Sequence, residues 1–194
     1  MSLKERVYSV LVVSSAENFN KSLYELLPPA KYSPVDTVSN VNAAKRIIVE
    51  KAYDFILINA PLPDEFGSRF AIDASTIKNS IVLLLVRSDD YAPTFDKVAE
   101  HGVFILSKPT SKPAVINALD WMATARERIR KQENKTHSLE DKMAEIKIVN
   151  RAKLLLISEM HMDESQAHHY IEKQAMDRCI TRKVVAEEIV KTYS

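Results

Sequence analysis

The chain has 194 residues, 46% of them hydrophobic, so it is long enough for one full domain plus a smaller unit. Its 27 basic and 26 acidic residues leave a net charge of +1, so overall charge favours neither nucleic acid nor a membrane surface as a partner. The single cysteine, Cys179, excludes an intramolecular disulfide, and no apolar run is long enough to span a membrane. We therefore expect a cytoplasmic protein.

Short apolar runs alternate with helical patterns through the first half of the chain. Five such runs predict strands, at 8–15, 34–39, 53–59, 80–86 and 102–107. Helical spacing predicts helices between them, at 16–27, 42–51, from about 68, and at 92–101. Strands that are almost continuously apolar are buried on both faces, which is typical of a parallel sheet covered by helices on both sides. The short connections favour a doubly wound α/β fold.

The segment ILINAPLPDEFG, residues 56–67, leads from a buried strand into a loop marked by two prolines and Gly67. Asn59 stands where the strand ends. Ligands and catalytic groups of open parallel sheets usually lie at this edge, so the segment indicates a site. The amide of Asn59 is neither a nucleophile nor a charged metal ligand.

A long helix is predicted in the second half, because no proline or glycine occurs between Pro113 and Met160. Apolar residues along it recur at spacings that fit a coiled-coil seam. The predicted seam residues are Met122, Ile129, Leu139, Met143 and Ile146. We expect a homodimer through this seam, and the alternative is a solitary solvated helix that bridges two units.

Two shorter helical patterns follow, at 164–178 and 182–193, with Asp163 and Thr181 as candidate N-caps. With the end of the long helix they predict a small three-helix bundle. The expected domains are therefore 1–112, a helical coiled-coil linker at 113–145, and 146–194.

The first half resembles the receiver domain of response regulators, which has a flavodoxin-like fold. The segments VLVVSS, ILINAPLPDEFG and GVFILSKP fall where that family has its acidic pair, its phosphoacceptor segment and a terminal Lys-Pro. The resemblance places Ser14 and Ser15 at the acidic pair, Asn59 at the phosphoacceptor and Lys108 at the lysine. An acyl phosphate needs a carboxylate and a bound divalent cation. We therefore expect a pseudo-receiver with a degenerate site.

The second half resembles the ANTAR domain, an RNA-binding module of transcription antiterminators, in the segment that begins NRAKLLLISEM and ends VAEEIV. From Glu140 to the end there are nine basic and ten acidic residues, so RNA affinity requires a local patch. The expected RNA-binding residues are Arg151, Ala152, Lys153, Arg178, Thr181, Arg182 and Lys183.

Together these features predict a bacterial antitermination regulator that binds tandem hairpins in mRNA leaders, without enzymatic activity, metal or cofactor. The residues His161, His168, His169 and Cys179 do not have zinc-site spacing. The alternative is a protein-interaction adaptor whose helical tail only dimerises. DNA binding is a third reading, less favoured because the turn before residue 182 lacks glycine. A regulatory protein or a small ligand is the expected partner of the receiver.

Overall fold

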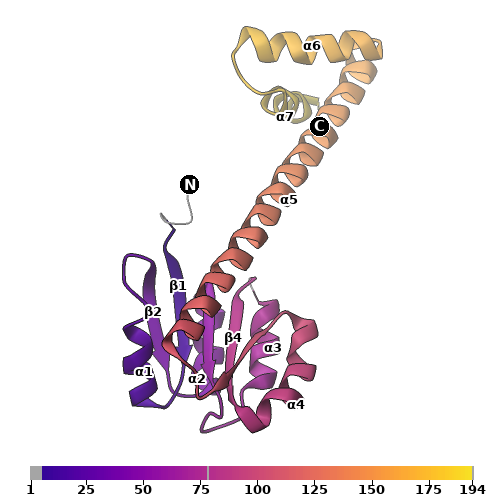
Figure 1. Cartoon of the computed structure of the whole chain (residues 1–194). Helices are drawn as coiled ribbons and strands as arrows, with labels where there is room; N and C mark the ends of the chain where they lie inside the picture. The colour runs from indigo at the N-terminus through magenta and orange to yellow at the C-terminus, as the bar shows by residue number, and fades with distance from the viewer. Residues whose placement is uncertain (1–5, 78, 194) are drawn as a thin grey trace. The chain divides into compact units, whose positions relative to one another are not determined.

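The computed structural model describes residues 6–77 and 79–193 (Figure 1). The chain divides into two compact units, Met1–Arg130 and Lys131–Ser194, each with its own apolar core. The long helix α5 (Lys112–Met160) belongs to both units. Because the first turns of α5 pack on the sheet, the first unit extends beyond the boundary expected at residue 112.

The first unit contains a five-stranded parallel sheet (Figure 1). Its strands are β1 (Tyr8–Val13), β2 (Tyr32–Val38), β3 (Phe55–Asn59), β4 (Ile81–Arg87) and β5 (Phe104–Lys108). Their spatial order is β2-β1-β3-β4-β5, and every neighbouring pair is parallel. The chain changes direction across the sheet between β1 and β3, and ligands of such sheets usually bind at the carboxyl ends of the strands beside this point. The predicted doubly wound sheet is confirmed.

Helices connect the strands in the predicted alternation. They are α1 (Glu17–Tyr24), α2 (Val41–Glu50), α3 (Ser68–Thr76), α4 (Ser88–Val98) and the short 3-10 helix η2 (Ala99–His101). The side chain of Asn40 starts α2 by accepting a hydrogen bond from the Ala43 amide over 2.8 Å. Gly67 precedes α3 with a φ of 99°, and a Cβ there would lie 3.2 Å from Ile58. Glycine therefore suits this turn in both conformation and space.

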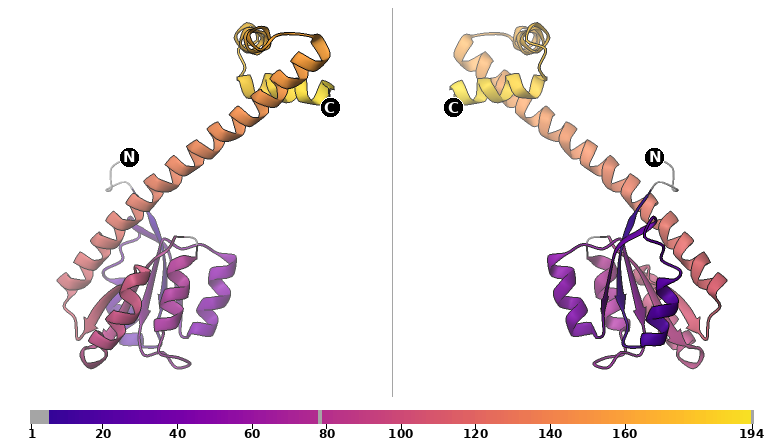
Figure 2. Two further views of the ribbon diagram at one scale, coloured as in Figure 1. Left: turned by 90° about the vertical axis from the view of Figure 1, so that its right-hand side faces the viewer. Right: turned by 90° about the vertical axis from the view of Figure 1, so that its left-hand side faces the viewer.

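Alternate strand residues supply two separate cores on the two faces of the sheet. In β3, Phe55 and Leu57 belong to one core, whereas Ile56 and Ile58 belong to the other. Helices α1 and α5 cover the first core, and α2, α3 and α4 cover the second (Figure 2). Burial on both faces explains why β3 and β4 are apolar at every position before their last residue rather than at every second one.

The first part of α5 does not supply a seam for a second chain. Met122 is fully buried in the core beneath α1 and α5, and Ile129 packs against that core. The expectation that Met122 lies on the dimer seam is therefore wrong, and Ile129 is already partly covered within the chain. The three later seam positions, Leu139, Met143 and Ile146, are exposed.

The second unit is a three-helix arrangement of the end of α5 with α6 (Glu164–Asp177) and α7 (Arg182–Tyr193). Asp163 caps α6 through a reciprocal pair of hydrogen bonds with Gln166, of 2.7 and 2.9 Å. The core residues are Ala152, Leu156, Ala167, Ile171, Ala175, Val185, Ala186 and Ile189. Four of these eight are alanines, which allow the helices to approach closely. Within the described residues, no helix has both the length and the apolar character needed to cross a membrane.

Candidate functional site

Three of the four residues expected at the receiver site meet at the carboxyl edge of the sheet. Lys108, at the end of β5, donates a hydrogen bond to Asn59 Oδ1 over 2.6 Å and another to the carbonyl oxygen of Ala60. Asn59 Nδ2 donates to Ser14 Oγ over 3.1 Å. Ser15, the next residue along the chain, is exposed. Parallel strands end at one edge, which is why residues 49 positions apart come together.

This hydrogen-bonded set, the Ser14–Asn59–Lys108 cluster, is largely withdrawn from solvent. Ser14 is 2% exposed and Asn59 is 7% exposed. Burial lowers the pKa of Lys108, and the nearby positive charge of Arg87 lowers it further. The polar atoms of the cluster already serve as partners for one another, so the site is internally satisfied.

The chemistry available to the cluster is limited. It offers an ammonium, an amide and a hydroxyl, none of which is a carboxylate that could form an acyl phosphate. Neutral oxygens alone hold a hard divalent cation weakly. Among residues 6–77 and 79–193, no three His, Cys, Asp or Glu side chains are grouped closely enough to hold a metal.

One hydroxyl near the cluster escaped the sequence interpretation. Ser88 follows β4 directly, and its Oγ donates to the carbonyl oxygen of Lys108 over 2.9 Å. The strand β4 ends at Arg87, and this boundary determines which residue can reach β5.

The two aspartates nearest β3 in the sequence have other roles. Asp64 accepts hydrogen bonds from the amides of Val41 and Asn42 over 3.0 and 2.9 Å, and these bonds lower its pKa. It therefore caps α2. Asp54 lies at the opposite end of β3 from Asn59, where it pairs with arginines of α5. Neither carboxylate is part of the cluster.

Three of the expected RNA-binding cations, Arg178, Lys153 and Arg182, form ion pairs within the second unit. Both terminal nitrogens of Arg178 donate to Glu188, over 2.5 and 2.8 Å. This hydrogen bonding lowers the pKa of Glu188 and raises that of Arg178. Lys153 Nζ lies 3.2 Å from Glu164 Oε1. These pairs are at the surface, where ion pairs contribute little net free energy.

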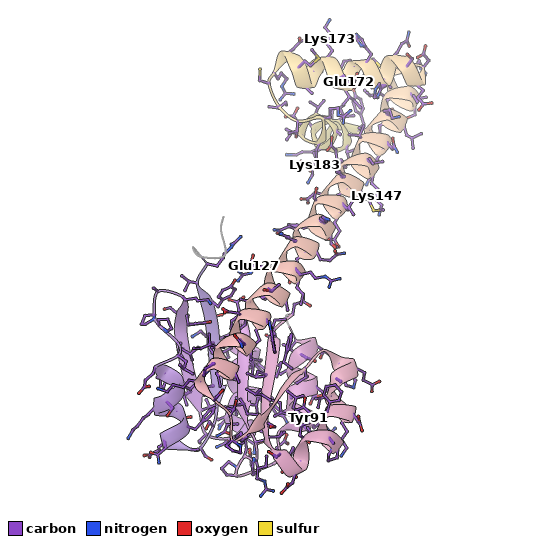
Figure 3. All side chains as sticks on the ribbon, in the orientation of Figure 1. Tyr91, Glu127, Lys147, Glu172, Lys173 and Lys183 are labelled. Carbon is purple, nitrogen blue, oxygen red and sulfur yellow. The ribbon has the colours of Figure 1, made fainter. Side chains whose placement is uncertain are left out.

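Arg182, at the start of α7, joins all three helices. Its guanidinium lies 3.4 Å from Glu145 on α5 and 3.5 Å from Glu172 on α6. Glu172 is also 3.3 Å from His168 Nε2. Figure 3 shows Glu172 on the side of α6 that faces α7, whereas Lys173 points away from it. The charged groups thus gather where the three helices converge.

The remaining expected RNA-binding residues differ in exposure. Ala152 is fully buried in the core of the second unit, so its role is close helix packing and direct contact with RNA is excluded in this structure. Thr181 Oγ1 accepts from the Val184 amide over 3.4 Å, near the start of α7. Arg151 and Lys183 are exposed.

Two adjoining hollows lie beside α5 in the second unit. The first, which we call the three-helix hollow, has a volume of about 460 Å³. It is lined by Lys142, Glu145, Ile146, Val149, Asn150, Lys153, His168 and Arg182. The second, the α7 hollow, shares Lys142 and Glu145 with it and adds Thr181, which precedes α7, and Lys183 of α7. Sequence analysis did not single out Lys142 or His168. The spacing of Lys142 and Lys153, about three helical turns, places them on one face of α5 and could have indicated Lys142.

Comparison with known proteins supports both halves of the interpretation. Residues 137–190 match the ANTAR domain. The transcriptional regulatory protein PdtaR of Mycobacterium tuberculosis is 24% identical over 184 residues, which is 94% of this chain and 89% of the relative. The aliphatic amidase regulator of Pseudomonas aeruginosa is 30% identical over 90 residues, 46% of this chain and 45% of the relative.

The first unit also has structural counterparts. The signal receiver domain of an HD domain-containing protein from Pseudomonas fluorescens superposes with a TM-score of 0.59 and 21% identity, covering 68% of this chain and 96% of that one. A receiver domain from Methylobacillus flagellatus gives a TM-score of 0.51 and 20% identity, covering 60% and 98%. These likenesses establish the receiver fold.

Proposed function

Because the chain joins a receiver fold to an ANTAR domain, we propose that it is a cytoplasmic, non-enzymatic regulator of transcription antitermination. Its ANTAR domain binds tandem hairpins in the leaders of nascent mRNA and favours an antiterminated structure over a terminator. The ANTAR match over residues 137–190 carries this proposal. The names of the two regulatory relatives support it.

The charge distribution of the second unit is compatible with RNA as the partner. Its net charge is close to zero, but Lys142, Lys153, Arg182 and Lys183 all line the two adjoining hollows. Exposed ion pairs such as that of Lys153 are worth about 0–1 kcal/mol, so a phosphate group can replace the acidic partner. Binding through such a patch weakens as salt concentration rises, because counterions compete for the phosphates.

We assign the Ser14–Asn59–Lys108 cluster to a degenerate phosphoacceptor site. The amide of Asn59 occupies the place of the acid and is held by Lys108 from one side and by Ser14 from the other. A receiver of this kind does not switch by phosphorylation. Control then passes to a partner protein, to a small ligand at the carboxyl edge of the sheet, or to the abundance of the regulator.

Dimerisation fits the exposed apolar positions on the later part of α5. Leu139 and Met143 are four residues apart, and each is about 60% exposed. Ile146, the third exposed seam position, lines the three-helix hollow instead. A dimer brings two ANTAR domains to two hairpins, and this linkage raises the effective concentration for the second binding event.

RNA capture by the full-length protein tests the function. Crosslinked host RNA is recovered with the wild type and with a Lys153→Gln, Lys183→Gln double variant of the second unit. We expect enrichment of leader segments that carry tandem hairpins, lost in the double variant because two phosphate-binding charges are removed. A matched variant, Lys21→Gln with Lys97→Gln, removes two exposed charges from the first unit and should retain the enrichment. Equal recovery by both variants, or no enrichment with the wild type, would reject RNA binding through this patch.

A second candidate function is that of a protein-interaction adaptor, and one surface feature favours it. Tyr91 lies on α4 (Figure 3). Its ring stacks with that of Phe95, with centroids 5.9 Å apart, and Phe95 is 44% exposed. Exposed aromatic side chains are common in protein interfaces. An adaptor would show no response to the Lys153→Gln, Lys183→Gln change and would lose a protein partner after Phe95→Ala.

A further inference from the structure

The three-helix hollow is lined by both apolar and cationic side chains. Ile146 and Val149 of α5 supply the apolar groups, and Lys142, Lys153 and Arg182 surround them. We propose that this hollow receives one unstacked base from the loop of an RNA hairpin. The inference rests on the proposed RNA-binding function and specifies how that function would read sequence.

The size and lining of the three-helix hollow suit a single base. Its volume of about 460 Å³ lies within the range of about 300–1,000 Å³ that is typical of small-molecule sites. Sequence-specific RNA recognition usually targets loop bases that can be turned out of the stack and packed against side chains. The apolar groups of Ile146 and Val149 can cover the face of such a base, and the imidazole of His168 offers a ring for stacking.

Charge complementarity favours RNA over an apolar ligand. A nucleotide whose base lies in the hollow has its phosphates close to the cationic lining residues Lys142, Lys153 and Arg182. The adjoining α7 hollow continues the cationic surface through Lys183. Figure 3 places Lys183 at the start of α7, beside α5. A path for the backbone on both sides of the inserted base is therefore present in the second unit.

The polar lining residues of the three-helix hollow determine which bases can form hydrogen bonds there. The carboxylate of Glu145 can only accept hydrogen bonds, so it favours a base with an exocyclic amino group. Asn150 can donate and accept along the same edge of the base. Adenine, cytosine and guanine carry an amino group, whereas uracil does not. Uracil can offer this carboxylate only its ring N3–H, so we expect it to be disfavoured at the inserted position.

The test measures loop preference separately from overall affinity. The probe is a pool of RNA stem-loops with one constant stem and a randomised loop, incubated with the full-length protein. Sequencing of the retained RNA gives the preference among loops, and retention at rising salt gives the electrostatic component. The two quantities separate the base-binding inference from the proposed RNA binding.

Two pairs of variants isolate the hollow. Ile146→Lys adds a charge to the lining of the three-helix hollow. Met143→Lys adds the same charge at an equally exposed position that does not line either hollow. Both residues are predicted seam positions, so any effect of weakened dimerisation appears in both. His168→Ala removes the ring from the hollow, and His169→Ala removes the neighbouring exposed ring as its control.

We expect the wild type to prefer loops with an amino-bearing base at one position by about tenfold, which is on the order of one hydrogen bond to a charged acceptor. Ile146→Lys and His168→Ala should abolish this preference, while Met143→Lys and His169→Ala retain it. Salt-sensitive retention without any loop preference would overturn the base pocket and leave RNA binding intact. The same loss in each variant and its control would also overturn the pocket. Failure of the wild type to retain any RNA would reject the proposed function and the pocket together.

Discussion

The guanidinium of Arg126 donates a hydrogen bond to the carboxylate of Asp54 over 2.9 Å and thereby fastens α5 to the sheet of the first unit. Arg130, one turn later, donates to the same oxygen over 2.7 Å, and the Ser9 amide donates to the other oxygen. The side chains of Arg126 and Asp54 are 13% and 12% exposed. This nearly buried network fixes the start of the long helix.

Removal of the Asp54 charge should destabilise the first unit. Asp54→Asn leaves two arginines beside each other without their shared carboxylate, and loss of one member of a buried pair costs about 3–5 kcal/mol. Because these groups keep some exposure, we expect the free energy of unfolding to fall by about 2 kcal/mol. Urea unfolding of the full-length protein measures the change.

The control for this prediction is a more exposed ion pair that also joins α5 to the rest of the first unit. Lys31 and Asp120 lie 2.8 Å apart, and the Asp120 side chain is 57% exposed. Asp120→Asn should cost about 0.5 kcal/mol or less. A similar loss in the two variants would contradict a special contribution from the buried network.

The Asp54 network should also make stability depend on acid pH. Burial raises the pKa of Asp54, but the hydrogen bond from Arg126 and the other favourable contacts outweigh it, so the pKa is lowered in the folded state. The stabilisation is therefore complete above the unfolded pKa of about 4 and disappears as pH falls through the lower folded value. Urea unfolding between about pH 6 and pH 2 should show the wild type and Asp54→Asn converging as pH falls. A constant difference across this range would contradict the assignment.

The sheet was predictable because its signal is local. Every residue of β3 before Asn59 is apolar. Such a short, uninterrupted apolar run is typical of a strand in a sheet that is covered on both faces. Asn59 and Lys108 were also predictable as neighbours, since parallel strands end at one edge. The exact start of α4 was not, because Pro93 suggested a beginning near residue 92 and the helix instead starts at Ser88, with the proline inside it.

The wrong predictions arise where the sequence pattern shows that a helix face is apolar but does not identify what packs against it. Met122 and Met143 have the same heptad spacing, but one packs on the sheet and the other faces solvent. Ala152 belongs to a motif that suggests RNA contact, yet a small side chain also serves close helix packing. His168 and Lys142 line the same hollow because α6 packs beside α5, and no local sequence pattern predicts this packing.

The two methionines should therefore respond differently to truncation. Met122→Ala opens a cavity in a fully packed core and should reduce the free energy of unfolding by about 2–5 kcal/mol. Met143→Ala, at a position 59% exposed, should change it by less than about 0.5 kcal/mol. The measurement is made at protein concentrations where sedimentation velocity shows a monomer, because dimerisation adds to apparent stability. Equal losses would place Met143 in a buried contact that this structure lacks.

The receiver fold should not accept a phosphoryl group in its natural sequence. The Asn59 amide lacks the carboxylate that an acyl phosphate needs, and Ser14 and Ser15 lack the charge that binds Mg²⁺ tightly. Intact mass spectrometry after incubation with acetyl phosphate and Mg²⁺ should detect no phosphoryl adduct on the wild type. Asn59→Asp alone should also remain unmodified, because the metal still lacks charged ligands, whereas Ser14→Asp, Ser15→Asp and Asn59→Asp together should form the adduct. Modification of the wild type at a residue of the Ser14–Asn59–Lys108 cluster would show that the site is not degenerate.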